Sequence, residues 1–329
     1  MRHKNLIKGF FLILFIFPYL SISAEGDTPE EPIQESPPSD TAAQESSVPK
    51  KVALPRSFTP SQNTRITALT EQISQTSPNE VERLFYEKNG FLTLYREAQT
   101  NDPQGCIILM HGNNEHPDWP NVIHPVRMKM VQYSWCTLSI EIPDYKEKES
   151  LSLIPSDKKE TAKLDVKLPN EDIVFGRLNA AIGFANQQGI SNISLLGYGS
   201  GATYALKYSV EKQLNTGALI LVSVSLPEPA SPFNLAKLLA SGQQPTLDYY
   251  IRPNQYNQQY AKARRIAMQQ RKDPSPTYTQ VKVTSNSQFA IDENQLIQRI
   301  RGFLKQNTQQ RKQLKQLPKT QKALFYQSP

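Results

Sequence analysis

Polar and apolar positions fall into two alternating kinds of segment between residues 105 and 306. Short runs such as residues 105–110 are apolar on both faces, which is typical of a central parallel strand covered by helices. The longer segments between them carry apolar residues at helical spacing, as in residues 294–306. This alternation predicts an α/β fold with a mostly parallel central sheet and helices on both faces.

The individual elements follow from these runs and from the glycines and prolines that separate them. Two β-prone runs at residues 82–86 and 91–95 flank Lys88-Asn89-Gly90, and this Asn-Gly predicts a hairpin that opens the sheet. Residues 145–170 are charged and lack a clear period, so we expect a flexible insertion over the carboxyl edge of the sheet. We expect further strands at residues 135–142, 192–196, 217–224, 245–250 and 278–284, and helices at residues 65–73, 121–133, 171–189, 201–214, 234–240 and 255–270.

The first 24 residues have the pattern of a secretory signal peptide. Three basic residues precede an almost entirely apolar run at residues 10–20, and residues 21–24 offer small side chains for cleavage after Ala24. An uncleaved membrane anchor is the alternative, but the run is short for a span and Pro18 lies near its end. We therefore expect an exported, periplasmic protein with no transmembrane span after cleavage.

The segments on either side of the expected folded domain, residues 61–306, are polar. Residues 25–60 are rich in Pro, Glu, Ser, Thr and Gln and have too few large apolar residues to fold, so we expect a disordered linker. Residues 307–329 form a basic tail without acids, either solvated or in weak contact with an anionic surface. The formal charge of +7 has no accompanying pattern of a nucleic-acid module, so we expect no nucleic-acid partner.

The stretch Gly197-Tyr198-Gly199-Ser200-Gly201 lies between a predicted strand and a predicted helix. It fits the G-x-S-x-G nucleophile elbow of the α/β-hydrolases except at the nucleophile itself, where Gly199 stands. Ser200 comes one place later and would be the first helical residue. That position favours a cap or a pocket-lining hydroxyl over a nucleophile.

The other members of a Ser-Asp-His triad are also missing from their expected places. In this fold the acid and then the histidine follow the serine along the chain. All four histidines precede the elbow: His3, His111, His116 and His124. After the last predicted strand the base position reads Gln288, and after residue 250 the acid position reads Asn254. Neither amide takes up a proton at a useful pH.

Parts of a site remain at the predicted carboxyl edge of the sheet. The backbone around Gly112, Asn113, Gly199 and Ser200 can supply an anion-binding pair of N–H groups. The candidate catalytic side chains are Ser200, His111, His116 and Asp118. The histidines with Glu115 and Asp118 also suggest a metal site, but their spacing matches no zinc motif. We therefore expect neither a metal nor a cofactor, and structural hydrogen bonding is the plainer interpretation of this loop.

Cys106 and Cys136 lie near the beginning of two strands that are neighbours in the strand order of hydrolases. Because exported proteins retain disulfides, we expect these cysteines to form a bridge. On the chain-entropy model such a bridge stabilises the fold by about 3.5 kcal/mol. Bridges between adjacent parallel strands are uncommon, so two buried thiols are the alternative.

The assembled motifs resemble a proteobacterial family of the α/β-hydrolase superfamily, the domain of unknown function 3530. The resemblance covers roughly residues 65–306, and the His-Pro-Asp-Trp-Pro loop at residues 116–120 is its most specific part. It implies the fold, and it implies that glycine at position 199 is a family trait. Other members carry a histidine where this chain has Gln288. The remaining matching motifs are residues 91–95, 109–112, 123 with 125–127, 135–143, 197–202 and 245–248.

These observations lead to one main hypothesis and two alternatives. We expect a pseudoenzyme, an exported hydrolase-fold protein that acts as a binding or scaffold module of the cell envelope. Its partner would be an unidentified small molecule or envelope component. The first alternative is an esterase-like hydrolase with a non-standard site that uses Ser200 or the His111/His116 loop. The second is an interaction protein that works through its acidic linker and basic tail.

Overall fold

The computed structural model describes residues 60–146, 167–212, 217–227, 231–251, 255–273, 276–283 and 292–309. The predicted signal peptide, the linker up to residue 59 and the tail from residue 310 lie outside these residues, as do Asn254, Gln288 and most of the predicted insertion. Within the described part of the chain, no helix combines the length and the apolar content that crossing a bilayer requires.

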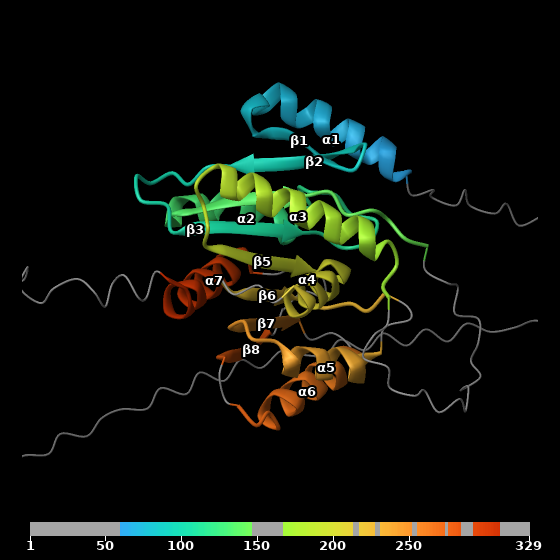
Figure 1. Cartoon of the computed structure of the whole chain (residues 1–329), viewed down its shortest axis with the longest axis vertical. Helices are drawn as coiled ribbons and strands as arrows, with labels where there is room; N and C mark the ends of the chain where they lie inside the picture. The colour runs from blue at the N-terminus through green and yellow to red at the C-terminus, as the bar shows by residue number, and fades with distance from the viewer. Residues whose placement is uncertain are drawn as a thin grey trace, which may run out of the picture. The chain divides into compact units, whose positions relative to one another are not determined.

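Eight strands of the described residues form one sheet. They are β1 (Val81–Tyr86), β2 (Asn89–Arg96), β3 (Gly105–Met110), β4 (Trp135–Ile140), β5 (Ile193–Tyr198), β6 (Leu219–Val222), β7 (Thr246–Ile251) and β8 (Tyr278–Val283). Their spatial order is β1-β2-β4-β3-β5-β6-β7-β8, seen in Figure 1 from β1 near the top to β8 near the bottom. β2 pairs antiparallel with both β1 and β4, and all other neighbours are parallel.

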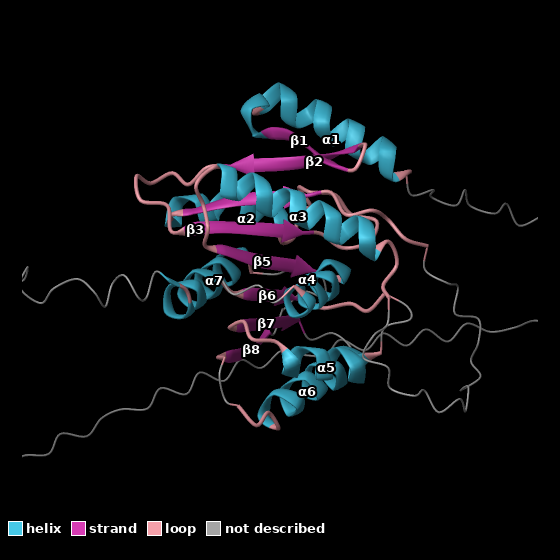
Figure 2. Ribbon diagram, viewed as in Figure 1, coloured by secondary structure: helices cyan, strands magenta, loops and turns pink. Residues whose placement is uncertain are grey.

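Helices alternate with the strands after β3, as the sequence predicts (Figure 2). The α-helices of the described residues are α1 (Gln62–Thr76), α2 (Ile123–Lys129), α3 (Glu171–Gln187), α4 (Ser200–Glu211), α5 (Pro232–Ser241), α6 (Gln255–Gln269) and α7 (Glu293–Asn307). Two short 3-10 helices, η1 (Pro78–Glu80) and η2 (Met130–Tyr133), precede β1 and β4.

The two faces of the sheet bury separate apolar clusters. On one face, Ile108 and Leu138 pack in a cluster with residues of α3, α4 and α5. On the other face, Ile107 and Leu109 pack in a cluster with residues of α2 and α7. The side chains of successive β3 residues therefore point to opposite faces of the sheet, as the two-residue period of a strand requires. Because β3 and β4 are buried along their whole length, they hold the loops at their carboxyl ends firmly.

The hairpin of β1 and β2 is confirmed, but its turn differs from the prediction. Asn89 pairs with Tyr86 and Gly90 with Phe85, so the turn consists of Glu87 and Lys88. Glu87 has a φ of 54°, the left-handed conformation that the Asn-Gly pair was expected to supply. Both residues of the Asn-Gly pair lie within β2 instead.

The two cysteines form the predicted disulfide. β3 and β4 are parallel neighbours, and Cys106 lies directly opposite Cys136 in their register. Their Cα atoms are 4.5 Å apart and the sulfur atoms are bonded. Both residues are buried, so the bridge lies inside the cluster that α3 and α4 cover.

Candidate functional site

The carboxyl ends of β3, β4 and β5 bring three loops together, as expected for a ligand site in a parallel sheet. His111 begins the loop after β3, Asp144 lies in the loop after β4, and Gly199 follows β5. The Asn113 side chain joins the first two loops: its Nδ2 donates to Tyr145 O at 3.0 Å, and its Oδ1 accepts from Tyr145 N at 2.9 Å. The loops after β3 and β4 therefore form one connected rim.

Gly199 is the turning point of the elbow between β5 and α4. Its φ of 59° and ψ of −125° lie in a region where a side chain causes strain. A Cβ at Gly197 would lie 2.3 Å from Ala202 Cα, and a Cβ at Gly201 would lie 2.3 Å from Met110 O. Gly197 and Gly201 are therefore required by the close approach of α4 to the sheet, whereas conformation favours glycine at position 199.

Position 199 nevertheless has space for a side chain. A Cβ added to Gly199 would lie 3.5 Å from Gly112 Cα and 3.6 Å from Ser225 Oγ, which are ordinary contacts. Ser225 is an exposed residue of the loop after β6, and its N–H donates to Gly199 O at 3.0 Å. The elbow thus keeps the sharp turn and the space of a nucleophile position without a nucleophile.

Two backbone donors of the loop after β3 are occupied by groups of the protein itself. Gly112 N–H donates to Glu115 Oε2 at 2.6 Å. Asn113 N–H donates to Ser200 Oγ at 2.9 Å. In α/β-hydrolases an N–H group of this loop contributes to the oxyanion hole. A substrate oxygen would have to displace a carboxylate or a hydroxyl to reach these donors.

Glu115 is a site residue that the sequence suggested only as a metal ligand. Burial raises the pKa of Glu115 to about 7, although its hydrogen bond from Gly112 acts in the opposite direction. The pKa of Tyr198, at the end of β5, is raised by its own burial and by the Glu115 charge. A carboxyl group with a pKa near 7 suits general acid–base chemistry. The sequence pattern does not reveal this raised pKa, because burial of Glu115 is a property of the folded loop.

His111 is fully buried and both of its ring nitrogens contact backbone groups. Nδ1 lies 2.8 Å from Gly112 O, and Nε2 accepts a hydrogen bond from Ile142 N at 2.9 Å. Because a carbonyl accepts and an amide donates, the ring carries its proton on Nδ1 and is neutral. Burial lowers the pKa of His111 to about 3. The ring connects the loop after β3 to the residues after β4, and this connection uses the hydrogen bonds of both ring nitrogens.

His116 and Asp118 stabilise the His-Pro-Asp-Trp-Pro loop from within. His116 Nδ1 accepts from Asp118 N at 3.2 Å, and its ring packs edge-on against Trp119. The Asp118 carboxylate accepts from Arg127 Nε at 2.8 Å and lies 3.0 Å from His124 Nδ1. Burial acts to raise the pKa of Asp118, but the hydrogen bonds from His124 and Arg127 lower it overall.

Arg127 packs against the His-Pro-Asp-Trp-Pro loop and is 2% exposed. It pairs with Asp118 and with Glu80, and Glu80 also pairs with Arg96. A guanidinium at this depth requires such partners because an unpaired buried charge is strongly destabilising. The network joins α2 to the loop and to η1, which gives the most specific motif of the sequence a structural role.

The helix α1 is bound to the loop after β4. Gln62 Nε2 donates to Glu141 Oε1 at 3.0 Å, and Gln62 Oε1 accepts from Asp144 N at 2.8 Å. Arg65 pairs with Asp144 at 2.5 Å, and Asp144 also accepts from Asn114 N at 3.1 Å. The start of α1 therefore belongs to the rim, a relationship across 80 residues that the sequence did not suggest.

The predicted site residues separate into two groups. Gly112, Asn113, Gly199 and Ser200 come together at the elbow, with His111 directly behind them. His116 and Asp118 instead line a cavity of about 560 Å³ between α1 and the loop. Among the described residues, no group of three or more His, Cys, Asp or Glu is arranged to hold a metal ion.

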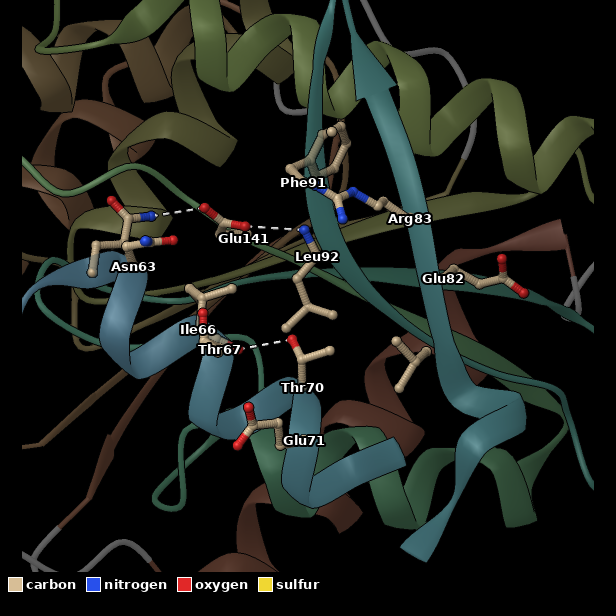
Figure 3. A pocket seen from close by; sticks show the side chains of 13 residues that line it. Asn63, Ile66, Thr67, Thr70, Glu71, Glu82, Arg83, Phe91, Leu92 and Glu141 are labelled. Carbon is tan, nitrogen blue, oxygen red and sulfur yellow. Dashed lines mark hydrogen bonds between the residues drawn. The ribbon is translucent and has the colours of Figure 1, made fainter. Parts of the chain in front are cut away.

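A cavity of about 620 Å³ lies between α1 and the hairpin of β1 and β2. Figure 3 shows polar side chains of α1, such as Asn63 and Thr67, facing the strands across it. At one end the Glu141 carboxylate accepts from Leu92 N at 3.0 Å. The cavity has a mixed polar and apolar lining and includes no residue of the elbow.

The fold is similar to that of several solved hydrolases. A dienelactone hydrolase from Anabaena variabilis is 15% identical with a TM-score of 0.50, and the match covers 69% of this chain and 97% of that one. For Est1E from Butyrivibrio proteoclasticus the identity is 9%, the TM-score 0.49 and the coverage 68% and 97%. At 15% identity the likeness to the dienelactone hydrolase shows the fold alone: an α/β-hydrolase fold with a mostly parallel sheet. No curated protein matches the sequence.

The family comparison extends over most of the chain. The profile of the family described as "Protein of unknown function (DUF3530)" matches residues 10–306 of the 329 residues. The matched span contains the hairpin, the His-Pro-Asp-Trp-Pro loop and the elbow with Gly199. The chain therefore belongs to the DUF3530 family.

Proposed function

We propose that this chain is a non-catalytic member of the α/β-hydrolase fold that binds a ligand without transforming it. The observation that carries the proposal is the composition of the elbow. Gly199 supplies no nucleophile, and the N–H groups of Gly112 and Asn113 already bind Glu115 and Ser200. Acyl transfer needs both an activated nucleophile and donors that are free to stabilise an oxyanion.

The surroundings of Ser200 support the same conclusion. Ser200 is 1% exposed, and its hydroxyl accepts from Asn113 N. The neighbouring histidine, His111, uses both ring nitrogens for backbone contacts. A serine becomes nucleophilic when an adjacent base accepts its proton, and neither residue is arranged for that transfer.

The proposed ligand is a small molecule or a component of the cell envelope. The cavity beside α1 has a volume of about 620 Å³, within the range of about 300–1,000 Å³ that is usual for small-molecule sites. Its lining combines apolar side chains such as Phe91 and Ile66 with the polar groups of Glu141 and Thr67. A lining of this kind suits an amphipathic ligand.

We also propose that the protein is exported to the periplasm after removal of residues 1–24. The N-terminal pattern supports this proposal, and so does the bridge between Cys106 and Cys136, because disulfides persist in oxidising compartments. N-terminal sequencing of the protein from fractionated cells should give a periplasmic chain that begins at Glu25. A chain recovered from the cytoplasm with its first 24 residues intact would contradict export.

An esterase-like hydrolase with a non-standard site is the second candidate. Glu115 favours it, because a carboxyl group whose pKa is about 7 lies at the elbow and can exchange protons near neutral pH. In this alternative Ser200, or the loop of His111 and His116, would carry the chemistry after a rearrangement that releases Ser200 from Asn113.

An acyl-ester assay separates the two candidates. Purified protein is incubated with p-nitrophenyl acetate and butyrate beside the Ser200→Ala and Glu115→Gln variants. The binding proposal predicts rates equal to buffer for all three proteins. Hydrolysis by the wild type that either substitution abolishes would establish the second candidate instead.

A further inference from the structure

A basic trough runs between α6 and β8. Two cavities of about 450 and 470 Å³ lie there and share Arg265 and Gln280 in their linings. The first extends to Lys282 near the end of β8, and the second to Pro276 before its start. Together they follow the whole strand, and α6 lies beside it at the lower end of the view in Figure 1. We call this surface the α6–β8 trough.

The α6–β8 trough carries positive charge only. Its charged side chains are Lys262, Arg265, Arg271 and Lys282, and no Asp or Glu lines either cavity. Lys262, Arg265 and Lys282 are exposed. Arg271 Nη1 is buried and has no hydrogen-bond partner among the described residues. A surface of this kind attracts an anionic partner.

The floor of the trough is held rigid by one buried carboxylate. Asp248 of β7 is fully buried and accepts two hydrogen bonds from Arg264, at 2.8 and 2.9 Å. Tyr278 and Gln280 of β8 donate to the same carboxylate at 2.7 and 2.9 Å, and Gln280 also donates to Ala261 O of α6. Helix and strand are thus fixed to each other, so the trough is formed before any partner arrives.

The outer edge of β8 lies beside the trough. β8 is the last strand of the sheet, so no other strand of the described residues pairs with this edge. Thr277 O accepts a hydrogen bond from Thr246 N at 2.8 Å. The backbone N–H and C=O groups of the odd-numbered residues along β8 therefore point toward β7. Because backbone direction alternates along a strand, the N–H and C=O groups of Tyr278, Gln280 and Lys282 point to the free edge.

We propose that the outer edge of β8 binds an acidic, extended peptide segment of a partner protein as an added strand. Backbone pairing along β8 would position the segment, and its Asp or Glu side chains would lie over Lys262, Arg265 and Lys282. An added strand uses both the donors and the acceptors of the edge, which a phosphate polymer cannot do. A second copy of this chain fits poorly because two edges paired together would bring like charges face to face.

Fluorescence anisotropy with the full chain tests the proposal. The probe is a labelled peptide of about ten residues that alternates Glu with the β-forming Thr. A peptide of the same charge with two central prolines cannot add as a strand, and a Lys-Thr peptide reverses the charge. The variant is Lys262→Glu with Arg265→Glu. Its matched control is Arg299→Glu with Lys305→Glu, which reverses two exposed charges on α7.

We expect saturable binding of the Glu-Thr peptide, with affinity about tenfold weaker in the α6 variant because two attractions become repulsions. The α7 control should stay within about twofold of the wild type, and the proline and Lys-Thr peptides should bind at least tenfold more weakly. Equal binding of the proline peptide, displacement of the Glu-Thr peptide by an equal charge of polyphosphate, or an unchanged affinity in the α6 variant would overturn the proposal. So would sedimentation that shows a dimer broken by the same two substitutions.

Discussion

The Glu115 carboxylate accepts a hydrogen bond from Gly112 N at 2.6 Å, in the loop after β3, which in α/β-hydrolases supplies one N–H group of the oxyanion hole. An acidic side chain of the protein therefore occupies a backbone donor of this loop. Burial keeps the pKa of this carboxyl at about 7, so its charge changes within the physiological range.

Glu115 gives the protein a pH-dependent stability with a definite sign. Its pKa is about 7 in the folded chain and 4.5 ordinarily. Between these values the folded state binds more protons than the unfolded state, so stability falls as pH rises. Glu115→Gln keeps an acceptor for Gly112 N and removes the titration. From pH 4.5 to 7 the wild type should therefore lose on the order of 2 kcal/mol relative to the variant.

Urea unfolding at a series of pH values measures this difference. His111 acts in the opposite sense, because burial lowers its pKa to about 3 and its contribution is lost as pH falls through the range below 6.5. Both proteins contain His111, so the difference between them isolates Glu115. Glu71→Gln, an exposed change on α1, is the matched control. A wild type and a Glu115→Gln variant with parallel pH profiles would contradict the assignment.

The elbow should accept serine at position 199 but not at position 197. A Cβ at Gly199 meets only ordinary contacts, so Gly199→Ser should fold, at a cost of about 1–3 kcal/mol for its left-handed conformation. A Cβ at Gly197 would lie 2.3 Å from Ala202 Cα, so Gly197→Ser should fail to fold or melt far lower. Circular dichroism melts of the two variants test the comparison. Equal melting temperatures would show that the close approach of Ala202 to Gly197 does not exclude a side chain at position 197.

Arg127 should be one of the most sensitive residues outside the sheet. Arg127→Met leaves Glu80 and Asp118 without their buried partner, and we expect a loss of about 3–5 kcal/mol in unfolding free energy. Lys167→Met breaks an exposed pair with Asp172 and should leave the urea midpoint unchanged. If both substitutions had the same small effect, the His-Pro-Asp-Trp-Pro loop would not depend on Arg127.

The bridge between Cys106 and Cys136 should be present in the mature protein. Titration of thiols in denaturant without a reductant should find none, because the two cysteines of the chain are bonded to each other. Replacing both by alanine should lower the free energy of unfolding by about 3.5 kcal/mol through the freer unfolded chain. Two titratable thiols in the unreduced protein would rule the bridge out.

The fold was predictable because its signals are local. The apolar run at residues 105–110 and the glycines at 197 and 201 each reflect burial of a short segment, which sequence pattern records directly. The Asn-Gly signal predicts the hairpin turn two residues too late, because the left-handed residue is Glu87 and Asn89-Gly90 lies in the strand instead. The Asn-Gly rule considers only neighbouring residues, whereas the pairing register of β1 and β2 decides which residues form the turn.

The contacts within the site were less predictable because they connect loops that lie far apart in the sequence. The sequence predicts Ser200 at the start of α4, where it lies, but its hydrogen bond from Asn113 depends on the meeting of β3 and β5. The effect of burial on Glu115 likewise has no counterpart in residue spacing. That all four histidines precede the elbow can be read directly from the sequence.

The central claim, that the elbow contains no activated serine, is tested most directly by intact-mass spectrometry after exposure to a fluorophosphonate. Such a reagent forms a stable adduct with a serine that a neighbouring base activates. The account predicts an unchanged mass for the native protein at neutral pH. A stoichiometric adduct that maps to Ser200 or Ser225, and that disappears when the protein is unfolded before treatment, would contradict it.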